Sequence, residues 1–366
     1  MIEDPFYLSP QRIIVSRVAI LYHPDLIHYD FGLGHPFRGD RFPRFMNLLR
    51  AKGILNRDDV ELHEPEMAGD EDLQLIHSSA YIRMVEVMAE RRIPLSADTP
   101  LNPGIVRAGR LIVGSAIKAG ELVIDGRCRV AEVVGGGLHH AGRDYGGGFC
   151  IFNDVAICAQ HLRERRGLSR ILIFDTDAHA GNGTMDIFYD DPHVLFISIH
   201  QDPRTIYPGT GFTHQIGEGE GEGYTVNIPL PPGADDRCLE VVLQRIFKPL
   251  AREFRPEIIL RNGGSDPHFQ DGLASLGFSL RGLRRIGEAV SEASSEAGCG
   301  VVDFCCSGYN PQTVAMGWLA LLSGVAGLEV ELEESSRPPM AGRGIFERTL
   351  RVVEELERRL EAYWSL

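Results

Sequence analysis

The chain has 366 residues, which is enough for about two average domains or for one large α/β domain. Hydrophobic residues make up 43% and charged residues 24%, so the chain can bury a sizeable core and does not have a disordered composition. A formal net charge of −14 argues against sequence-independent binding to nucleic acid, which needs a basic surface. The acidic start lacks the pattern of a secretory signal, and no apolar run reaches the roughly 18 residues of a membrane helix.

The cysteines are odd in number and show no CxxC spacing. This pattern indicates reduced thiols in a cytoplasmic protein, and it argues against a disulfide framework or a cysteine zinc site. The seven residues are Cys128, Cys150, Cys158, Cys238, Cys299, Cys305 and Cys306.

Short apolar runs rich in Val and Ile recur along the chain without strict alternation. Such runs are typical of strands that are buried on both faces of a parallel sheet. The predicted strands are Val18–Leu21, Val130–Val134, Ile171–Phe174, Val194–Ile199, Ile258–Leu260 and Val301–Phe304.

Helical spacing of apolar residues separates these runs. The predicted helices are Val106–Ala119, Asp154–Glu164, Leu239–Phe254, Leu280–Ala297 and a last one from about Gly344 to Tyr363. The stretch Gly209–Gly233 is rich in Gly and Pro, so most of it is predicted to be a surface loop. Alternation of strand and helix over residues 1–366 predicts one α/β domain with a parallel sheet.

Potential metal ligands follow two of the predicted strands, at the sheet edge where ligands usually bind. Asp175, Asp177 and His179 alternate along an extended segment, so their side chains can converge on one side. Asp266 follows a later strand, after glycines that allow close approach of the backbone. Two carboxylates and one imidazole suit a catalytic zinc site, and they also permit Fe(II), Mn or Co. Each segment alone would also suit an ordinary polar turn or helix cap.

Two adjacent histidines, His139 and His140, follow three glycines at another predicted strand end. A lone histidine is usually structural, but a tandem pair in this position favours proton transfer near neutral pH. Tyr309 follows the last predicted strand, where its hydroxyl can point into a cleft or simply pack. Tyr207 lies in a Pro-Gly turn that can place an aromatic ring at the rim of the site.

Five segments taken together resemble, in order, the motifs of one superfamily. They are HHA…GFCIFND, DTDAHAGNG, YPGTG, GGSD and SGYN, and the resemblance extends from Gly34–Phe42 to Ser307–Asn310. The superfamily contains the zinc-dependent histone deacetylases, the acetoin-utilisation proteins and the acetylpolyamine amidohydrolases. The resemblance implies the arginase/deacetylase fold, in which helices flank a central, mostly parallel eight-stranded sheet, within a single histone-deacetylase-like catalytic domain.

The resemblance implies a zinc-dependent amide hydrolase. Asp177, His179 and Asp266 would bind the zinc ion, with Fe²⁺ as an alternative metal in cells. His140 would be the general base that acts on water, and His139 would be its electrostatic partner and a proton donor to the leaving amine.

Three further side chains receive supporting roles from the resemblance. Asp175 would orient His139, Asn182 would orient His140, and Tyr309 would donate a hydrogen bond to the developing oxyanion. Members of the family often carry Asp in place of Asn182. Because Asn has no charge, His140 should hold its proton less tightly here.

The resemblance also assigns the substrate tunnel and one or two structural potassium ions. The predicted substrate-binding residues are Gly148, Phe149, Tyr207 and Leu273 in the wall, Asp98 at the rim and Arg41 at the foot. The first potassium ion would contact Asp175, Ser198, Ile199 and the backbone of Asp177 and His179. A second would involve Phe188, Asp191, Val194 and Tyr224.

Two other classes of protein compete with this interpretation. Arginase-type manganese enzymes share the fold but need two additional bridging carboxylates, and Gly181 and His268 stand at those positions. One catalytic metal ion is therefore expected rather than two. A non-catalytic acyl-binding protein would be favoured by loss of a ligand, of the histidines or of the tyrosine, and none of these is lost.

The sequence is compatible with two classes of substrate. An acylated lysine in a peptide or protein is the first expectation, and an acylated polyamine or another small acylated amine is the alternative. No direct contact with nucleic acid or membrane is expected, and a homo-oligomer stays an option. Leu138 and Tyr207 depart from the residues common in the family and bear on the size of the acyl group.

Overall fold

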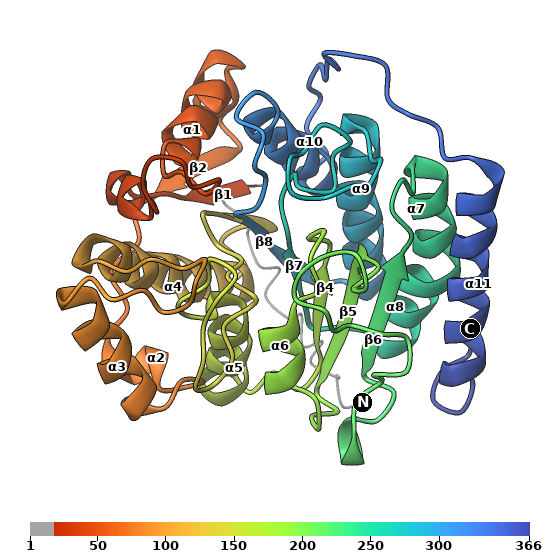
Figure 1. The fold of residues 1–366 in the computed structure, drawn as a ribbon, viewed down its shortest axis with the longest axis horizontal. Coiled ribbons are helices and arrows are strands. Elements are labelled where there is room, and N and C mark those ends of the chain that lie inside the picture. Colours follow the sequence, from red (N-terminus) through yellow and green to blue (C-terminus); the bar gives the residue numbers. More distant parts are fainter. Residues whose placement is uncertain (1–17) are drawn as a thin grey trace, which may run out of the picture.

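The computed structural model describes residues 18–366, which form one eight-stranded sheet covered by helices (Figure 1). The strand order is β2-β1-β3-β8-β7-β4-β5-β6, and every neighbouring pair is parallel. The strands are β1 (Val18–Leu21), β2 (Val60–His63), β3 (Val130–Val134), β4 (Ile171–Asp175), β5 (Val194–Gln201), β6 (Thr225–Leu230), β7 (Ile258–Asn262) and β8 (Gly300–Cys305). The start of the chain, on which the expectation about a secretory signal rests, lies outside the described residues.

The predicted fold class is confirmed, with one correction. All six predicted strands are present, but the sheet is parallel throughout rather than mostly parallel. Parallel strands must be covered on both faces, which explains why the six runs are apolar without alternation. In β1, β3, β4, β5 and β7 every residue is buried.

Most of Gly209–Gly233 is a loop, as predicted, but Thr225–Leu230 within it forms the buried strand β6. The Gly-rich run ends at Gly223, and the apolar segment that follows pairs with β5. Pro229 obscured this strand in the sequence. It is tolerated because β6 is the edge strand of the sheet that residues 18–366 form, and an edge strand has a ladder partner on one side alone.

Helices pack on both faces of the sheet (Figure 1). Helix α4 packs on β1, β3 and α5, whereas α9 packs on α10, β7 and β8. The helices are α1 (Arg41–Ala51), α2 (Asp70–Leu73), α3 (Ser79–Glu90), α4 (Pro103–Ile124), α5 (Asp154–Arg166), α6 (Asn182–Ile187), α7 (Asp236–Val242), α8 (Lys248–Phe254), α9 (Leu280–Ala297), α10 (Val314–Ala326) and α11 (Arg343–Leu360). No helix among residues 18–366 has both the length and the apolar character needed to cross a membrane.

The single helix predicted over Leu239–Phe254 is in fact interrupted. Helices α7 and α8 are separated by a π-helical turn at Leu243–Phe247. Pro249 lies just after this turn, and its ring nitrogen cannot donate the hydrogen bond that a regular helix requires. The widened turn accommodates the missing bond without breaking the path of the chain.

A cluster of charged side chains lies buried in the middle of the sheet, away from the strand ends. Glu132 on β3, Asp303 on β8 and Arg261 on β7 stand side by side in register, and Arg261 forms an ion pair with Asp303. Burial and the adjacent Asp303 carboxylate raise the pKa of Glu132 well above its usual range. Glu132 is therefore neutral at pH 7, and the cluster holds one positive and one negative charge.

Replacing Arg261 with methionine is expected to lower the free energy of unfolding by about 3–5 kcal/mol. The change leaves the buried Asp303 carboxylate without its counter-charge, and this loss far exceeds the value of an exposed ion pair. Urea denaturation followed by circular dichroism measures the difference. The control is Glu132→Gln, which should cost little because Glu132 already carries its proton; equal losses in both variants would contradict the charge assignment.

Candidate active site

Three of the predicted metal ligands converge at the carboxyl ends of β4 and β7. Asp177 and His179 follow β4, Asp266 follows β7, and the two strands are neighbours in the sheet. The Nδ1 atom of His179 lies 3.0 Å from Oδ1 of Asp177 and 3.1 Å from Oδ2 of Asp266. All three side chains are buried, and one donor atom from each lies within 4.8 Å of the others. This donor set is compact enough to hold one metal ion.

The pKa shifts of the three side chains favour the binding of a positive charge between them. Burial and the negative charge of Asp177 raise the pKa of Asp266 well above its usual range. Burial opposes charge on His179, but Asp177 and Asp266 outweigh it and raise the pKa of His179 to about 10. Asp266 and His179 therefore both retain protons beside the charged Asp177, and a bound cation would supply the positive charge that these protons provide.

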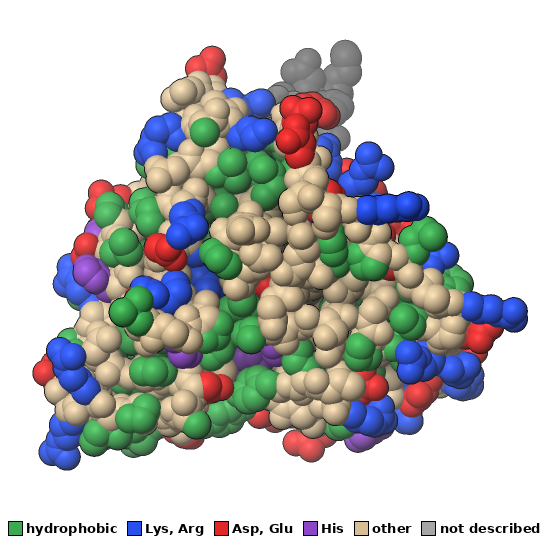
Figure 2. Space-filling view, turned by 45° about the horizontal axis from the view of Figure 1, so that its top comes forward, with side chains coloured by type: hydrophobic (Ala, Val, Ile, Leu, Met, Phe, Trp, Pro, Cys, Tyr) green, Lys and Arg blue, Asp and Glu red, His purple; other side chains and the backbone are tan. Residues whose placement is uncertain are grey.

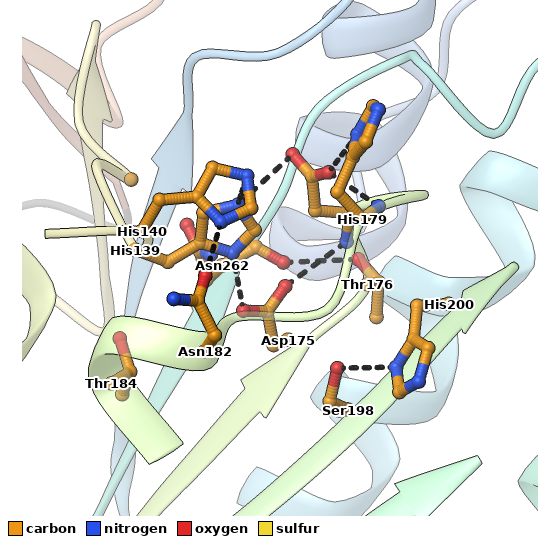
Figure 3. A network of polar contacts seen from close by, with 12 residues as sticks. His139, His140, Asp175, Thr176, His179, Asn182, Thr184, Ser198, His200 and Asn262 are labelled. Carbon is orange, nitrogen blue, oxygen red and sulfur yellow. Dashed lines mark hydrogen bonds and ion pairs between the residues drawn. The ribbon is translucent and has the colours of Figure 1, made fainter. Parts of the chain in front are cut away.

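The two adjacent histidines lie directly beside this group (Figure 3). Nδ1 of His139 lies 2.7 Å from Oδ2 of Asp175, and Nδ1 of His140 lies 2.8 Å from Oδ1 of Asn182. The two Nε2 atoms are 3.2 Å apart. Asp154 holds the preceding loop in place, because its carboxylate accepts the backbone N–H groups at 137 and 138. The structure therefore places each histidine in contact with the side chain that the resemblance assigns to it.

The environment separates the acid–base properties of the two histidines. Burial lowers the pKa of His139, but Asp175 and Asp177 overcome this effect and raise it to about 9. Burial and the positive charges of His139 and His179 hold the pKa of His140 well below its usual range. At neutral pH His139 is therefore a cation and His140 is a neutral imidazole that can accept a proton.

A cavity of about 240 Å³ opens above these groups. Figure 2 shows histidine side chains recessed between hydrophobic ones in the lower middle of the visible face. Five predicted substrate-binding residues line the cavity together with His140, His179 and Tyr309: Asp98, Gly148, Phe149, Tyr207 and Leu273. Ile206 also lines it. The sequence analysis did not single out this residue, although it directly precedes Tyr207.

Phe149 adopts a backbone conformation that is costly for a residue with a side chain. Its φ angle is 70°, in the left-handed region, and such strain costs about 1–3 kcal/mol. Two hydrogen bonds hold it there: the hydroxyl of Tyr29 donates to its carbonyl at 2.7 Å, and its N–H donates to Thr99 Oγ1 at 3.0 Å. Neither partner was predicted from the sequence, because each meets Phe149 only through the packing of distant loops.

Tyr309 reaches the cavity from the loop after β8, as predicted. Asp271 fixes the start of this residue, since its carboxylate accepts the N–H of Tyr309 at 2.6 Å. The rings of Phe149 and Tyr309 lie 5.6 Å apart. Burial, with Asp177 and Asp266 nearby, raises the pKa of Tyr309 well above its usual range, so the phenol keeps its proton and can donate. The sequence analysis missed Asp271.

The predicted rim and foot residues differ in their position. Asp98, predicted at the rim, lines the cavity, and its Oδ1 accepts the N–H of Gly148 at 3.2 Å. Arg41 lies behind Tyr309, in an adjacent hollow of about 300 Å³ that Tyr309 also lines. The guanidinium of Arg41 donates to backbone carbonyl groups, including that of Cys306 at 3.0 Å, and it lies 5.3 Å from the centre of the Tyr309 ring.

The residues predicted to bind the first potassium ion lie at or just after the end of β4 and within the neighbouring strand β5. Asp175 and Ser198 are register partners on β4 and β5, and Ser198 Oγ lies 2.8 Å from Nδ1 of His200 (Figure 3). Of the residues proposed for the second ion, Asp191 forms an ion pair with Arg163. The N–H of Phe196 donates to the carbonyl of Tyr224. Both potassium sites stay predictions.

The geometry disfavours a second, bridging metal ion. A Cβ atom at Gly181 would lie 2.3 Å from Oδ2 of Asp175, so a carboxylate cannot be added there without displacing Asp175. Nε2 of His268 lies 3.1 Å from Oε2 of Glu334, so this side chain is held by another partner. These contacts agree with the expectation of a single catalytic metal ion.

Comparison with known proteins connects this arrangement to one family. Residues 35–325 match the model of the histone deacetylase domain. A probable deacetylase of Archaeoglobus fulgidus is 34% identical over 356 residues, which cover 95% of this chain and 98% of that protein. The acetoin utilization protein AcuC of Bacillus subtilis is 35% identical over 271 residues, covering 72% of this chain and 69% of that protein.

A solved structure shows the same architecture. The crystal structure of the HDA15 HD domain superposes with a TM-score of 0.84 at 25% sequence identity, over 96% of each chain. The motif order, the sheet and the convergence of the polar side chains thus lead to the same assignment as these comparisons. The chain belongs to the histone deacetylase domain family and is a hydrolase that acts on amides.

Proposed function

We propose that this protein is a zinc-dependent deacylase that removes acetyl or related acyl groups from lysine side chains. The observation that carries the proposal is the convergence of Asp177, His179 and Asp266 beside a cavity that His140, His179 and Tyr309 line. Two carboxylates and one imidazole fit a catalytic zinc ion with an open position, and they also fit Fe(II).

Asp177, His179 and Asp266 would hold the ion, and His179 must release its proton for this to happen. When bound, the ion supplies a Lewis acid that polarises the amide carbonyl and acidifies water. This chemistry needs a nearby base and a nearby hydrogen-bond donor, and the cavity has one of each.

The side chains around the metal position supply the proton transfers and the hydrogen bond to the oxyanion. His140 is neutral and accepts the proton of the attacking water at Nε2, while its Nδ1–H donates to Asn182. Tyr309 donates its hydroxyl proton in a hydrogen bond to the carbonyl oxygen as negative charge develops on it. His139 is held as a cation by Asp175 and stabilises this charge, and it can supply the proton that the leaving amine requires.

The cavity walls suit an acylated lysine. Phe149 and Tyr207 present aromatic rings to an aliphatic chain, which favours the methylene groups of a lysine side chain. The hydrogen bonds that the described residues donate to the Asp98 carboxylate all go to Oδ1. Its Oδ2 is therefore available to a backbone amide of a peptide at the rim. The same oxygen can receive a cationic amine, which supports an acylated polyamine as the second candidate.

A hydrolysis assay on one zinc-loaded sample tests the proposal. Acetyl-, butyryl- and longer acyl-lysine peptides are compared with free acetyl-lysine and with N-acetylated putrescine and spermidine. We expect faster turnover of the peptides, loss of activity after chelation, and recovery on adding zinc. Full activity in metal-free protein would contradict the mechanism, and faster turnover of the polyamines would favour the second candidate.

The variant Asp98→Asn separates the two candidate substrates. It keeps an oxygen for the N–H of Gly148 but places an amide nitrogen where the free oxygen stood. We expect KM for acyl-lysine peptides to rise about tenfold, since a charged hydrogen bond is lost, with little change for free acetyl-lysine. An equal rise for both substrates would assign Asp98 to the cavity wall instead of peptide binding.

A further inference from the structure

A chain of hydrogen bonds leads from His140 through Asn182 to the protein surface. Oδ1 of Asn182 lies 2.8 Å from Nδ1 of His140, and Nδ2 of Asn182 donates to the hydroxyl of Tyr145 at 3.3 Å. That hydroxyl donates to Oδ2 of Asp186 at 2.5 Å. Tyr145 comes from the loop between β3 and α5, whereas Asn182 and Asp186 lie one turn apart on α6.

The Asp186 carboxylate at the outer end of this chain determines which atom donates in each hydrogen bond. The ionised Asp186 carboxylate can only accept a hydrogen bond, so the hydroxyl of Tyr145 must donate its single hydrogen to it. The oxygen of Tyr145 is then an acceptor, and the atom of Asn182 that faces it must be the amide nitrogen. The amide oxygen therefore faces His140, whose Nδ1 must carry a hydrogen to complete the last bond.

This order of donors matters because an asparagine side chain can turn over. Rotated by 180°, the amide of Asn182 would offer N–H to Nδ1 of His140, and the ring would have to carry its hydrogen on Nε2 instead. Nε2 is the atom that must be free to accept a proton in the proposed reaction. A carboxylate in place of Asn182 would have no such ambiguity, since both of its oxygens accept.

We propose that Tyr145 and Asp186 are positioning residues that fix the amide orientation of Asn182 and thereby hold His140 with its hydrogen on Nδ1. The inference rests on the proposed function for its catalytic meaning, but the protonation pattern itself is a property of the resting protein. Because all three bonds point the same way and end on a carboxylate, each strengthens the next. Through this chain the negative charge of Asp186 favours the hydrogen on Nδ1 of His140, although Asn182 itself is uncharged.

Tyr145 is held in place for this contact. A Cβ atom at Gly142 would lie 2.2 Å from its ring, so the ring occupies the space that this glycine leaves. The N–H of Gly142 also donates to the carbonyl of Tyr145 at 3.0 Å and closes a turn. Burial and the bond to Asp186 raise the pKa of Tyr145, so its hydroxyl keeps the hydrogen that the chain requires.

The test compares Tyr145→Phe with the unaltered zinc-loaded protein by NMR of ¹⁵N-labelled histidine. The ring is 40% exposed, so removing its hydroxyl should leave the fold intact. The His140 resonances, assigned with His140→Gln, should report a hydrogen on Nδ1 alone in the parent and a mixture of both ring tautomers in the variant. We expect kcat to fall about tenfold with KM unchanged.

Asp144→Asn is the matched control, because Asp144 is an exposed carboxylate on the same loop that bonds to Ser78 instead of Tyr145. It should leave the tautomer and kcat unchanged, whereas Asp186→Ala should reproduce the effect of Tyr145→Phe, and Asp186→Glu should restore it in part. A His140 tautomer that does not respond to Tyr145→Phe and Asp186→Ala would overturn the inference. If the tautomer responds but no variant hydrolyses amides, the positioning role stands and the proposed function fails.

Discussion

Replacing His140 with alanine is expected to lower kcat by about 10²- to 10⁴-fold on acyl-lysine substrates. The variant loses a neutral imidazole that lies beside the metal position and that can accept a proton at neutral pH. His139 cannot take over, because Asp175 and Asp177 keep it protonated. Metal binding should persist, since His140 is not one of the three converging donors.

Three measurements on the same preparation check this expectation: steady-state kinetics, bound zinc by mass spectrometry, and thermal unfolding. His161→Ala is the matched control, because His161 lies on α5 and pairs with Glu121 rather than with the site. It should retain near-normal turnover. If His140→Ala keeps normal turnover with zinc bound, another group is the base.

Replacing Tyr309 with phenylalanine is expected to lower kcat by about 10²- to 10³-fold, the usual effect of removing one donor to a developing oxyanion. The change removes only the hydroxyl, and Asp271 still holds the backbone of residue 309. KM should change little, because the hydrogen bond strengthens mainly as negative charge forms on the carbonyl oxygen.

Tyr207→Phe is a closely matched comparison, since Tyr207 and Tyr309 line the same cavity. Tyr207 is assigned to the cavity wall. Loss of its hydroxyl should therefore change kcat by less than about threefold, which is the effect expected from losing one weak hydrogen bond. Parallel kinetics of the two variants at saturating substrate decide the matter. Similar losses in both would show that neither hydroxyl is the specific donor.

The central strands and the core of the site were predictable from the sequence for one physical reason. In a parallel sheet the carboxyl ends of neighbouring strands meet at one edge, so polar residues that follow buried strands must come together there. This argument predicts the convergence of Asp177, His179 and Asp266 without the family resemblance, and in the structure one donor atom of each lies within 4.8 Å of the others. The tandem histidines were found in the same way.

The residues that the sequence analysis missed act through packing between distant segments. Tyr29 and Asp271 contact the site through loops that are far from their partners in the chain, and no local spacing announces such contacts. Strand β6 was missed because a Gly-rich run and Pro229 gave stronger local signals than its apolar residues. Tyr145 and Asp186 gave no signal at all, since both are exposed residues that reach the site only through hydrogen bonds between separate segments.

The lack of space at Gly181 limits how this chain can change. A carboxylate at this position would displace Asp175, the residue that holds His139 beside the metal position. The substitution that adds a ligand for a second metal ion would thus also remove the contact that holds His139. The single-metal and two-metal sites therefore exclude each other at this point of the fold. Any stepwise mutational route between them must pass through an intermediate that performs neither well. Laboratory evolution toward a binuclear enzyme should therefore fail unless the loop between β4 and α6 is rebuilt as a unit.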